Sequence, residues 1–184
     1  MTPVSTFDTV VVGAGSSGAV MASRLSEDPH RSVLLIEAGP DYGLIEDTPT
    51  EIIKALPRNV DIASKLLGED SIHDWSYTAT ATDLLNTISV PRGRLVGGSS
   101  AVNSSIFLRG IPEDYDLWAT HGNNEWSYEH LLAYMRLIED DPDFSEYYHG
   151  KLGPTPVLRF KENAWAKEQE IFYTASVGAG YQDC

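Results

Sequence analysis

Three glycines near the start of the chain, Gly13, Gly15 and Gly18, follow the spacing G-x-G-x-x-G. The β-branched run Thr9–Val12 comes directly before them and has the composition of a buried strand. Apolar residues then recur at helical spacing over residues 19–25. In such a strand–turn–helix unit the first glycine permits the tight turn, the second lets a pyrophosphate approach the backbone, and the third lets helix and strand pack closely. The stretch therefore predicts a phosphate-binding turn at a helix N-terminus.

A lone glycine motif is weak evidence for a dinucleotide site, so the interpretation depends on the element that follows it. A second strand-like run, Ser32–Ile36, ends at Glu37, nineteen residues beyond Gly18. A dinucleotide-binding βαβ unit places an acid there, because a carboxylate accepts hydrogen bonds from a ribose 2′-hydroxyl. The alternative is a glycine-rich turn in another kind of α/β protein, with Glu37 as an ordinary strand-end charge. An acid argues against a 2′-phosphate and hence against NADP, whereas the motif alone does not separate NAD from FAD.

Composition excludes several classes of partner. The 184 residues carry 13 basic and 27 acidic side chains, a formal net charge of −14, which disfavours nucleic acid and anionic membrane surfaces. The single cysteine, Cys184, excludes an internal disulfide and favours a reducing compartment. Asp8 precedes the first apolar run, no basic region does, and no apolar stretch approaches the length of a transmembrane helix. We therefore expect a cytoplasmic protein.

Residues 44–90 show no strong hydrophobic period. Short helices are predicted at Glu51–Leu56 and Ile62–Leu67, and an extended piece at Asp74–Thr78. A long, weakly patterned segment in an α/β unit is typical of a lid or excursion, or of disorder. Trp75 on its own merits is interpreted as a packing residue.

A second glycine-rich stretch lies at residues 91–110. The segment Gly97–Ser100 permits close backbone approach and can donate hydrogen bonds to an anion. Arg92 and Arg94 add positive charge to a chain that has little of it. A polar turn before a helix or strand containing Ile106–Leu108 is the alternative, and the residues alone leave both interpretations open.

The remaining third of the chain has helical patterns that we interpret as core faces. The predicted elements are a helix at Pro112–Gly122, a helix capped by Ser127 and running to Ile138, a strand at Val157–Phe160 and a helix at Ala164–Val177. Residues 139–156 form a loop with the acids Asp140, Asp141 and Asp143. We interpret these acids as solvated charge rather than a metal site, because the spacing of a calcium-binding loop is absent.

Taken together, the two glycine stretches resemble the glucose–methanol–choline (GMC) oxidoreductase family. Phe7–Gly18 with Leu34–Pro40 is similar to the start of that family, and Arg92–Asn103 with Phe107–Gly110 to its N-terminal signature. Similar spacing continues at Asp114–Trp118, Trp126–Tyr128, Tyr134 and His149–Pro154. The resemblance implies an α/β fold with a Rossmann-like FAD-binding domain over residues 1–150. That domain would include a long lid at about residues 40–90, and residues 151–184 would start an α+β substrate domain.

The resemblance also implies an activity, namely hydride transfer from a primary or secondary alcohol, as a small-molecule substrate, to FAD. The residues that match the family's FAD pyrophosphate turn are Gly13, Gly15, Ser16, Ser17 and Gly18, while Glu37 and Ala38 match the adenosine ribose site. Those that match positions along the pyrophosphate and flavin ring are Arg94, Val96, Gly98, Ser99, Asn103, Ser104, Ser105 and Ile106, with Trp75 near the cofactor. Some members attach FAD through a histidine at the position of Val102, so non-covalent FAD is expected here.

Catalytic residues are not assigned, because the family's catalytic histidine lies near the C-terminus of much longer chains. None of the five histidines present falls in the matching C-terminal motif. We also assign no metal ligand. The resemblance implies that a second polypeptide or fragment carries the substrate domain and the base. The alternatives that stay open are a GMC-like flavoprotein lyase or decarboxylase, a non-catalytic dinucleotide-binding module, and an NAD-dependent dehydrogenase.

Overall fold

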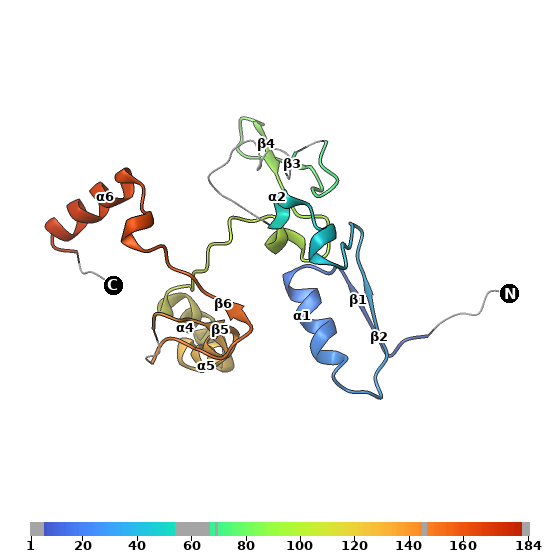
Figure 1. Ribbon diagram of the computed structural model, residues 1–184. Helices are drawn as coiled ribbons and strands as arrows, with labels where there is room; N and C mark the ends of the chain where they lie inside the picture. Colours follow the sequence, from blue (N-terminus) through green and yellow to red (C-terminus); the bar gives the residue numbers. More distant parts are fainter. Residues whose placement is uncertain (1–5, 54–66, 69, 145–146, 182–184) are drawn as a thin grey trace. The chain divides into compact units, whose positions relative to one another are not determined.

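The chain forms two compact units, Met1–Ile106 (unit 1) and Phe107–Cys184 (unit 2), in a computed structural model (Figure 1). The structure describes residues 6–53, 67–68, 70–144 and 147–181. The expected helix at Ile62–Leu67 falls almost entirely outside these residues, as does Cys184. The units divide after Ile106, whereas the sequence predicts a functional boundary after residue 150, and that functional boundary stays a prediction.

Unit 1 begins with a parallel βαβ element. Strand β1 (Thr9–Val12) pairs with β2 (Val33–Ile36), and helix α1 (Ser16–Leu25) connects them and lies alongside the pair (Figure 1). The helix packs so closely on β1 that a Cβ on Gly18 would lie 1.9 Å from the Gly13 carbonyl oxygen. This close approach is the reason for the third glycine of the motif. The predicted strands and helix are therefore confirmed.

The rest of unit 1 follows β2. The 3₁₀ turn η1 (Ile45–Asp47) and helix α2 (Thr50–Ile53) precede a hairpin of β3 (Tyr77–Thr80) and β4 (Thr87–Val90), and η2 (Gly98–Ala101) comes later. The sequence predicts part of β3 but misses the hairpin. Every residue of β3 is exposed, so no alternation of buried and exposed side chains marks the strand.

Unit 2 is built around a helix pair. Its elements are α4 (Pro112–Thr120), η3 (Asn124–Trp126), α5 (Tyr128–Ile138), β5 (Glu139–Asp140), β6 (Thr155–Pro156), η4 (Glu162–Ala164) and α6 (Lys167–Gly178). The three predicted helices are confirmed with shifted ends. The predicted strand at Val157–Phe160 is wrong, because the pairing with β5 is made by Thr155–Pro156 and continues only as one hydrogen bond from the Val157 N–H to the Asp140 carbonyl (3.0 Å).

Two further observations concern the helices. Ser127 occupies the predicted N-cap position of α5, but its hydroxyl lies 2.7 Å from His130 Nδ1 and does not cap the helix backbone. Within the described part of the chain, none of the helices is both long enough and apolar enough to cross a membrane.

Candidate functional site

The candidate site is a solvent-open hollow of about 640 Å³ in unit 1. The end of β1, the first turn of α1, the end of β2 and three later stretches, around residues 75–77, 92–93 and 98–99, surround it. The predicted cofactor residues that line it are Gly13, Gly15, Ser16, Ser17, Gly18, Glu37, Ala38, Trp75, Gly98 and Ser99. In open α/β sheets, ligands bind beyond the carboxyl ends of parallel strands, which is where this hollow lies.

The first wall of the hollow is the turn between β1 and α1. Gly13 has φ +93°, a left-handed conformation that favours glycine, and it turns the chain from the strand into the helix. No side chain caps the N-terminus of α1, and Ser16 and Ser17 in its first turn line the hollow. Because a helix N-terminus carries free N–H groups and partial positive charge, this wall suits an anion.

The second glycine stretch docks directly on the first. The Gly97 N–H donates to the Ala14 carbonyl (2.8 Å), and Gly15 and Gly97 form a parallel bridge. A Cβ on Gly98 would lie only 2.7 Å from Gly15 Cα, so the two backbones meet with no space for a side chain. Since Gly98 and Ser99 line the same hollow as the first turn, the structure favours a ligand-facing loop over a simple polar turn.

Glu37 connects the ends of the βαβ element. Its Oε2 accepts the Ala14 N–H (2.7 Å) and its Oε1 accepts the Gly39 N–H (3.0 Å). A carboxylate has about four acceptor positions, so these two bonds leave acceptor capacity on a residue that lines the hollow. Glu37 therefore orders the turn and can accept hydrogen bonds from a ligand hydroxyl.

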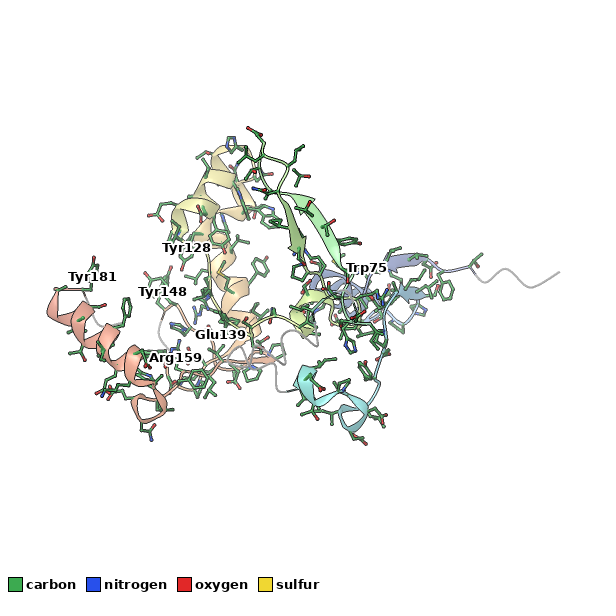
Figure 2. The ribbon with its side chains drawn as sticks, turned by 90° about the horizontal axis from the view of Figure 1, so that it is seen from above. Trp75, Tyr128, Glu139, Tyr148, Arg159 and Tyr181 are labelled. Carbon is green, nitrogen blue, oxygen red and sulfur yellow. The ribbon has the colours of Figure 1, made fainter. Side chains whose placement is uncertain are left out.

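A third wall comes from the segment around Trp75, which Figure 2 labels. The buried Asp74 carboxylate Oδ1 accepts the N–H groups of Arg92 (2.8 Å) and Ser76 (3.1 Å), and the Trp75 N–H donates to the Arg92 carbonyl (2.9 Å). The Trp75 ring stacks on Tyr77, with centroids 5.9 Å apart and planes 4° apart. Trp75 thus packs on Tyr77, and it is also 41% exposed and lines the hollow, so a role near the cofactor stays a prediction.

The remaining predicted cofactor residues, Arg94, Val96, Asn103, Ser104, Ser105 and Ile106, do not line the hollow in the described structure. The Val96 N–H donates to the Pro40 carbonyl (3.0 Å). Asn103 Oδ1 accepts the Ser105 N–H (2.8 Å) in a local turn, and Ile106 is 70% exposed. The roles implied for these residues stay predictions.

Some lining residues were missed by the sequence, namely Val12, Ile36, Tyr77, Arg92 and Gly93. Val12 and Ile36 end the two parallel strands, and the rule that ligands bind at the carboxyl ends of strands would have found them. Tyr77 lies two residues beyond Trp75 and stacks on it because Ser76 between them has φ +53°, a left-handed turn that the sequence does not signal. The sequence marks Arg92 for its positive charge within the second glycine stretch, but it assigns neither Arg92 nor Gly93 to the cofactor.

His73 lies beside this third wall and is buried. Its Nε2 contacts the Tyr42 hydroxyl, and the two rings are 5.8 Å apart. Burial lowers the pKa of His73 below its ordinary value of 6.5, while the Glu51 carboxylate raises it and the Arg94 guanidinium lowers it further. The neutral imidazole is therefore the form that fits the folded state.

Unit 2 contains a second group of polar side chains, among them Glu139 and Arg159, which Figure 2 labels. Glu139, Asp141 and His149 place potential metal-ligand atoms within 4.8 Å of one another. However, Arg159 Nη1 donates to both oxygens of Asp141 (2.7 and 2.8 Å), and Arg109 Nη2 lies 2.5 Å from Glu139 Oε2. Because each carboxylate is already paired with a guanidinium, we interpret the group as a salt-bridge network rather than a metal centre.

The network corrects the sequence interpretation as solvated charge for Asp141, which is fully buried, whereas Asp140 and Asp143 are exposed. Burial alone raises the pKa of a carboxyl, but hydrogen bonds from Arg159 and from the N–H groups of Asp143 and Phe144 outweigh it. The pKa of Asp141 therefore lies below 3.8 and its carboxylate is charged. This loop is held in place by buried, paired charge.

Comparisons with known proteins show which family the chain resembles in sequence. Residues 7–183 match the sequence model of the GMC oxidoreductase family. The mitochondrial choline dehydrogenase of Mus musculus is 37% identical over 94% of this chain and 28% of that protein. An uncharacterized GMC-type oxidoreductase of Rhodococcus erythropolis is 34% identical over 100% of this chain and 35% of that protein. The chain thus spans about a third or less of these relatives' length.

Solved structures agree with this similarity. Pyridoxine 4-oxidase from Mesorbium loti matches with a TM-score of 0.80 and 33% identity over 96% of this chain and 33% of that chain. A variant formate oxidase of Aspergillus oryzae matches with a TM-score of 0.74 and 28% identity over 99% of this chain and 32% of that chain. The fold is therefore that of the Rossmann-like α/β region of these proteins.

Proposed function

We propose, because the chain belongs to the GMC oxidoreductase family, that it is the FAD-holding N-terminal part of an alcohol oxidoreductase. One observation carries the proposal. Two glycine stretches far apart in the sequence meet backbone to backbone and line one hollow, together with the acid that ends β2. A site of this construction suits a dinucleotide.

The residues of the hollow fit FAD part by part. The turn at Gly13–Gly18 and the docked Gly98–Ser99 segment would hold the pyrophosphate, because their glycines leave the backbone uncovered where they line the hollow. Glu37 would accept hydrogen bonds from the adenosine ribose, and Trp75 would offer apolar ring surface. When bound, FAD supplies the acceptor for hydride from an alcohol carbon. This chain's own task is to bind and orient the cofactor.

Binding of FAD is proposed to be non-covalent. Val102, which occupies the position of the linking histidine in some family members, is buried at 8% exposure and its hydrocarbon side chain offers no nucleophile. Denaturation should therefore release all flavin from the chain. Flavin that co-migrates with the unfolded chain would contradict this.

The catalytic base is proposed to lie on a second polypeptide or on a C-terminal part outside this chain. None of the histidines in the described residues lines the hollow. His73 is engaged with Tyr42, His130 with Ser127, and His149 with the buried acids. The small share of the relatives' length that this chain spans supports the same proposal.

We propose that residues of about 40–90 act as a lid, because their described part includes a hairpin with exposed strands next to the hollow's Trp75 wall. Residues 151–184 would start the substrate domain. The charge of −14 supports the proposal that nucleic acid and anionic membranes are not partners, and the cysteine content supports the cytoplasm.

The proposal is tested by adding FAD to the purified chain, with and without its C-terminal companion, and recording flavin spectra anaerobically against a panel of primary and secondary alcohols. The proposal is supported if FAD binds and one alcohol bleaches the bound flavin, but only in the completed protein. Bound flavin that no alcohol bleaches in the completed protein favours the lyase or decarboxylase, or a dinucleotide-binding module. Failure to bind FAD while binding NAD would refute the flavin assignment.

A further inference from the structure

We propose that Arg92 is a cofactor-positioning residue whose guanidinium binds a phosphate group of the dinucleotide in the hollow of unit 1. The resemblance points instead to Arg94, two residues later. The inference rests on the proposed function, since it requires that a phosphate-bearing ligand enters the hollow.

The first argument is the charge of the lining. Among the described residues that line the hollow, Arg92 is the one cation and Glu37 the one anion. A diphosphate brings negative charge into a chain whose formal net charge is already −14. The neutral backbone of the glycine turns supplies hydrogen bonds but only partial charge, so a full positive charge at this wall offsets the repulsion.

The second argument is that the backbone of Arg92 is held at both its polar atoms. Its N–H donates to the Asp74 carboxylate (2.8 Å), and its carbonyl accepts the Trp75 N–H (2.9 Å). Asp74 is only 3% exposed, so this anchor is in the interior of the unit. A side chain that starts from a fixed backbone loses less conformational freedom when it binds a ligand.

The third argument is that the guanidinium retains donors. Arg92 Nη1 donates to the Pro91 carbonyl (2.7 Å). Among the described residues, this is the side-chain hydrogen bond that Arg92 makes. A guanidinium has five N–H donors in a planar fork, and that geometry matches the oxygens of a phosphate. Arg92 can therefore keep its bond to Pro91 and still bind a phosphate group.

Arg94 differs from Arg92 in where its side chain lies, although its backbone N–H is also held, by the His73 carbonyl (2.8 Å). Its Nε donates to the Ile72 carbonyl (3.1 Å), and its guanidinium lies over the Trp75 ring, 5.7 Å from the centroid. It does not line the hollow in the described structure. Its side chain thus lies against the Trp75 ring and outside the lining of the hollow.

The test compares Arg92→Gln, Arg94→Gln and Arg24→Gln for binding of FAD, ADP and adenosine by calorimetry over a series of salt concentrations. Arg24 is an exposed residue of α1 paired with Glu27, and it controls for the loss of one positive charge. We expect Arg92→Gln to weaken FAD and ADP binding by roughly tenfold, as for loss of a charge-assisted hydrogen bond. The affinity of this variant for FAD and ADP should also depend less on salt concentration. Adenosine binding should be unchanged in every variant. Arg92→Lys should recover part of the loss, because it keeps the charge without the fork.

Three results would overturn the inference. Arg92→Gln could bind ADP as tightly as the unsubstituted chain, or Arg94→Gln could show the phosphate-specific loss instead. Alternatively, Arg92→Gln could weaken adenosine as much as ADP, which would indicate distortion of the hollow. If the unsubstituted chain binds neither FAD nor ADP, the proposed function itself fails and this inference fails with it.

Discussion

Substitution of Gly98 by alanine tests whether the docking of the two glycine stretches creates the hollow. Gly98 has φ +55°, and a Cβ there would lie 2.7 Å from Gly15 Cα. Carbon atoms in contact lie about 3.5–4.0 Å apart, so the loops would have to separate by roughly 0.8 Å or more. The separation would stretch the hydrogen bond from the Gly97 N–H to the Ala14 carbonyl, now 2.8 Å.

The expected loss of stability has two parts. A left-handed backbone costs an alanine about 1–2 kcal/mol, and overpacking at a closed contact costs about 1–3 kcal/mol. Gly98→Ala should therefore lower the free energy of unfolding by about 2–5 kcal/mol. Gly43→Ala is a matched control, because Gly43 has φ +62° but open space around its Cβ position. It should lose only the backbone part, about 1–2 kcal/mol.

Urea unfolding followed by circular dichroism measures both free energies. Hydrogen exchange of the Gly97 amide reports the docking itself, and titration with FAD reports the hollow. Gly98→Ala should speed exchange of that amide and weaken FAD binding, whereas Gly43→Ala should change neither. Equal stability and equal exchange in the two variants would show that the close contact between the loops is not what holds them.

Two further predictions concern buried ionisable groups. Because burial lowers the pKa of His73 below 6.5, the unfolded chain binds more protons than the folded chain just below that pH. The stability that neutral His73 provides is thus present above pH 6.5 and is lost as the pH falls toward the lowered pKa. As the pH is lowered, the urea midpoint of unfolding should therefore fall less steeply in His73→Gln than in the unsubstituted chain. An unchanged slope in that variant would contradict this assignment. Arg109→Met leaves the buried Glu139 without the guanidinium now 2.5 Å away and should cost about 3–5 kcal/mol in urea unfolding. The exposed pair of Arg24 and Glu27 provides the comparison, since Arg24→Met should cost about 0–1 kcal/mol, and similar losses in the two variants would refute the distinction.

Much of unit 1 and of the helical content could be predicted from the sequence. The run Thr9–Val12, the glycine spacing and the helical period after it are signals within a few residues of one another, and they place β1 and α1 correctly. The acid at Glu37 was found because a βαβ unit has a nearly constant length. These features are local, so the order of residues along the chain is enough to define them.

The tertiary structure decided what the distant segments do. Whether residues 97–99 are a polar turn or a wall of the hollow depends on hydrogen bonds to Ala14, which no period in the sequence encodes. Whether Asp141 is solvated or buried depends on Arg159, eighteen residues later. Arg92 and Arg94 have the same side chain, and only the packing around Trp75 directs one into the lining and leaves the other outside it. Sequence patterns report the local structure that residues adjacent along the chain favour. Burial and charge pairing, in contrast, depend on distant segments that meet only when the chain folds.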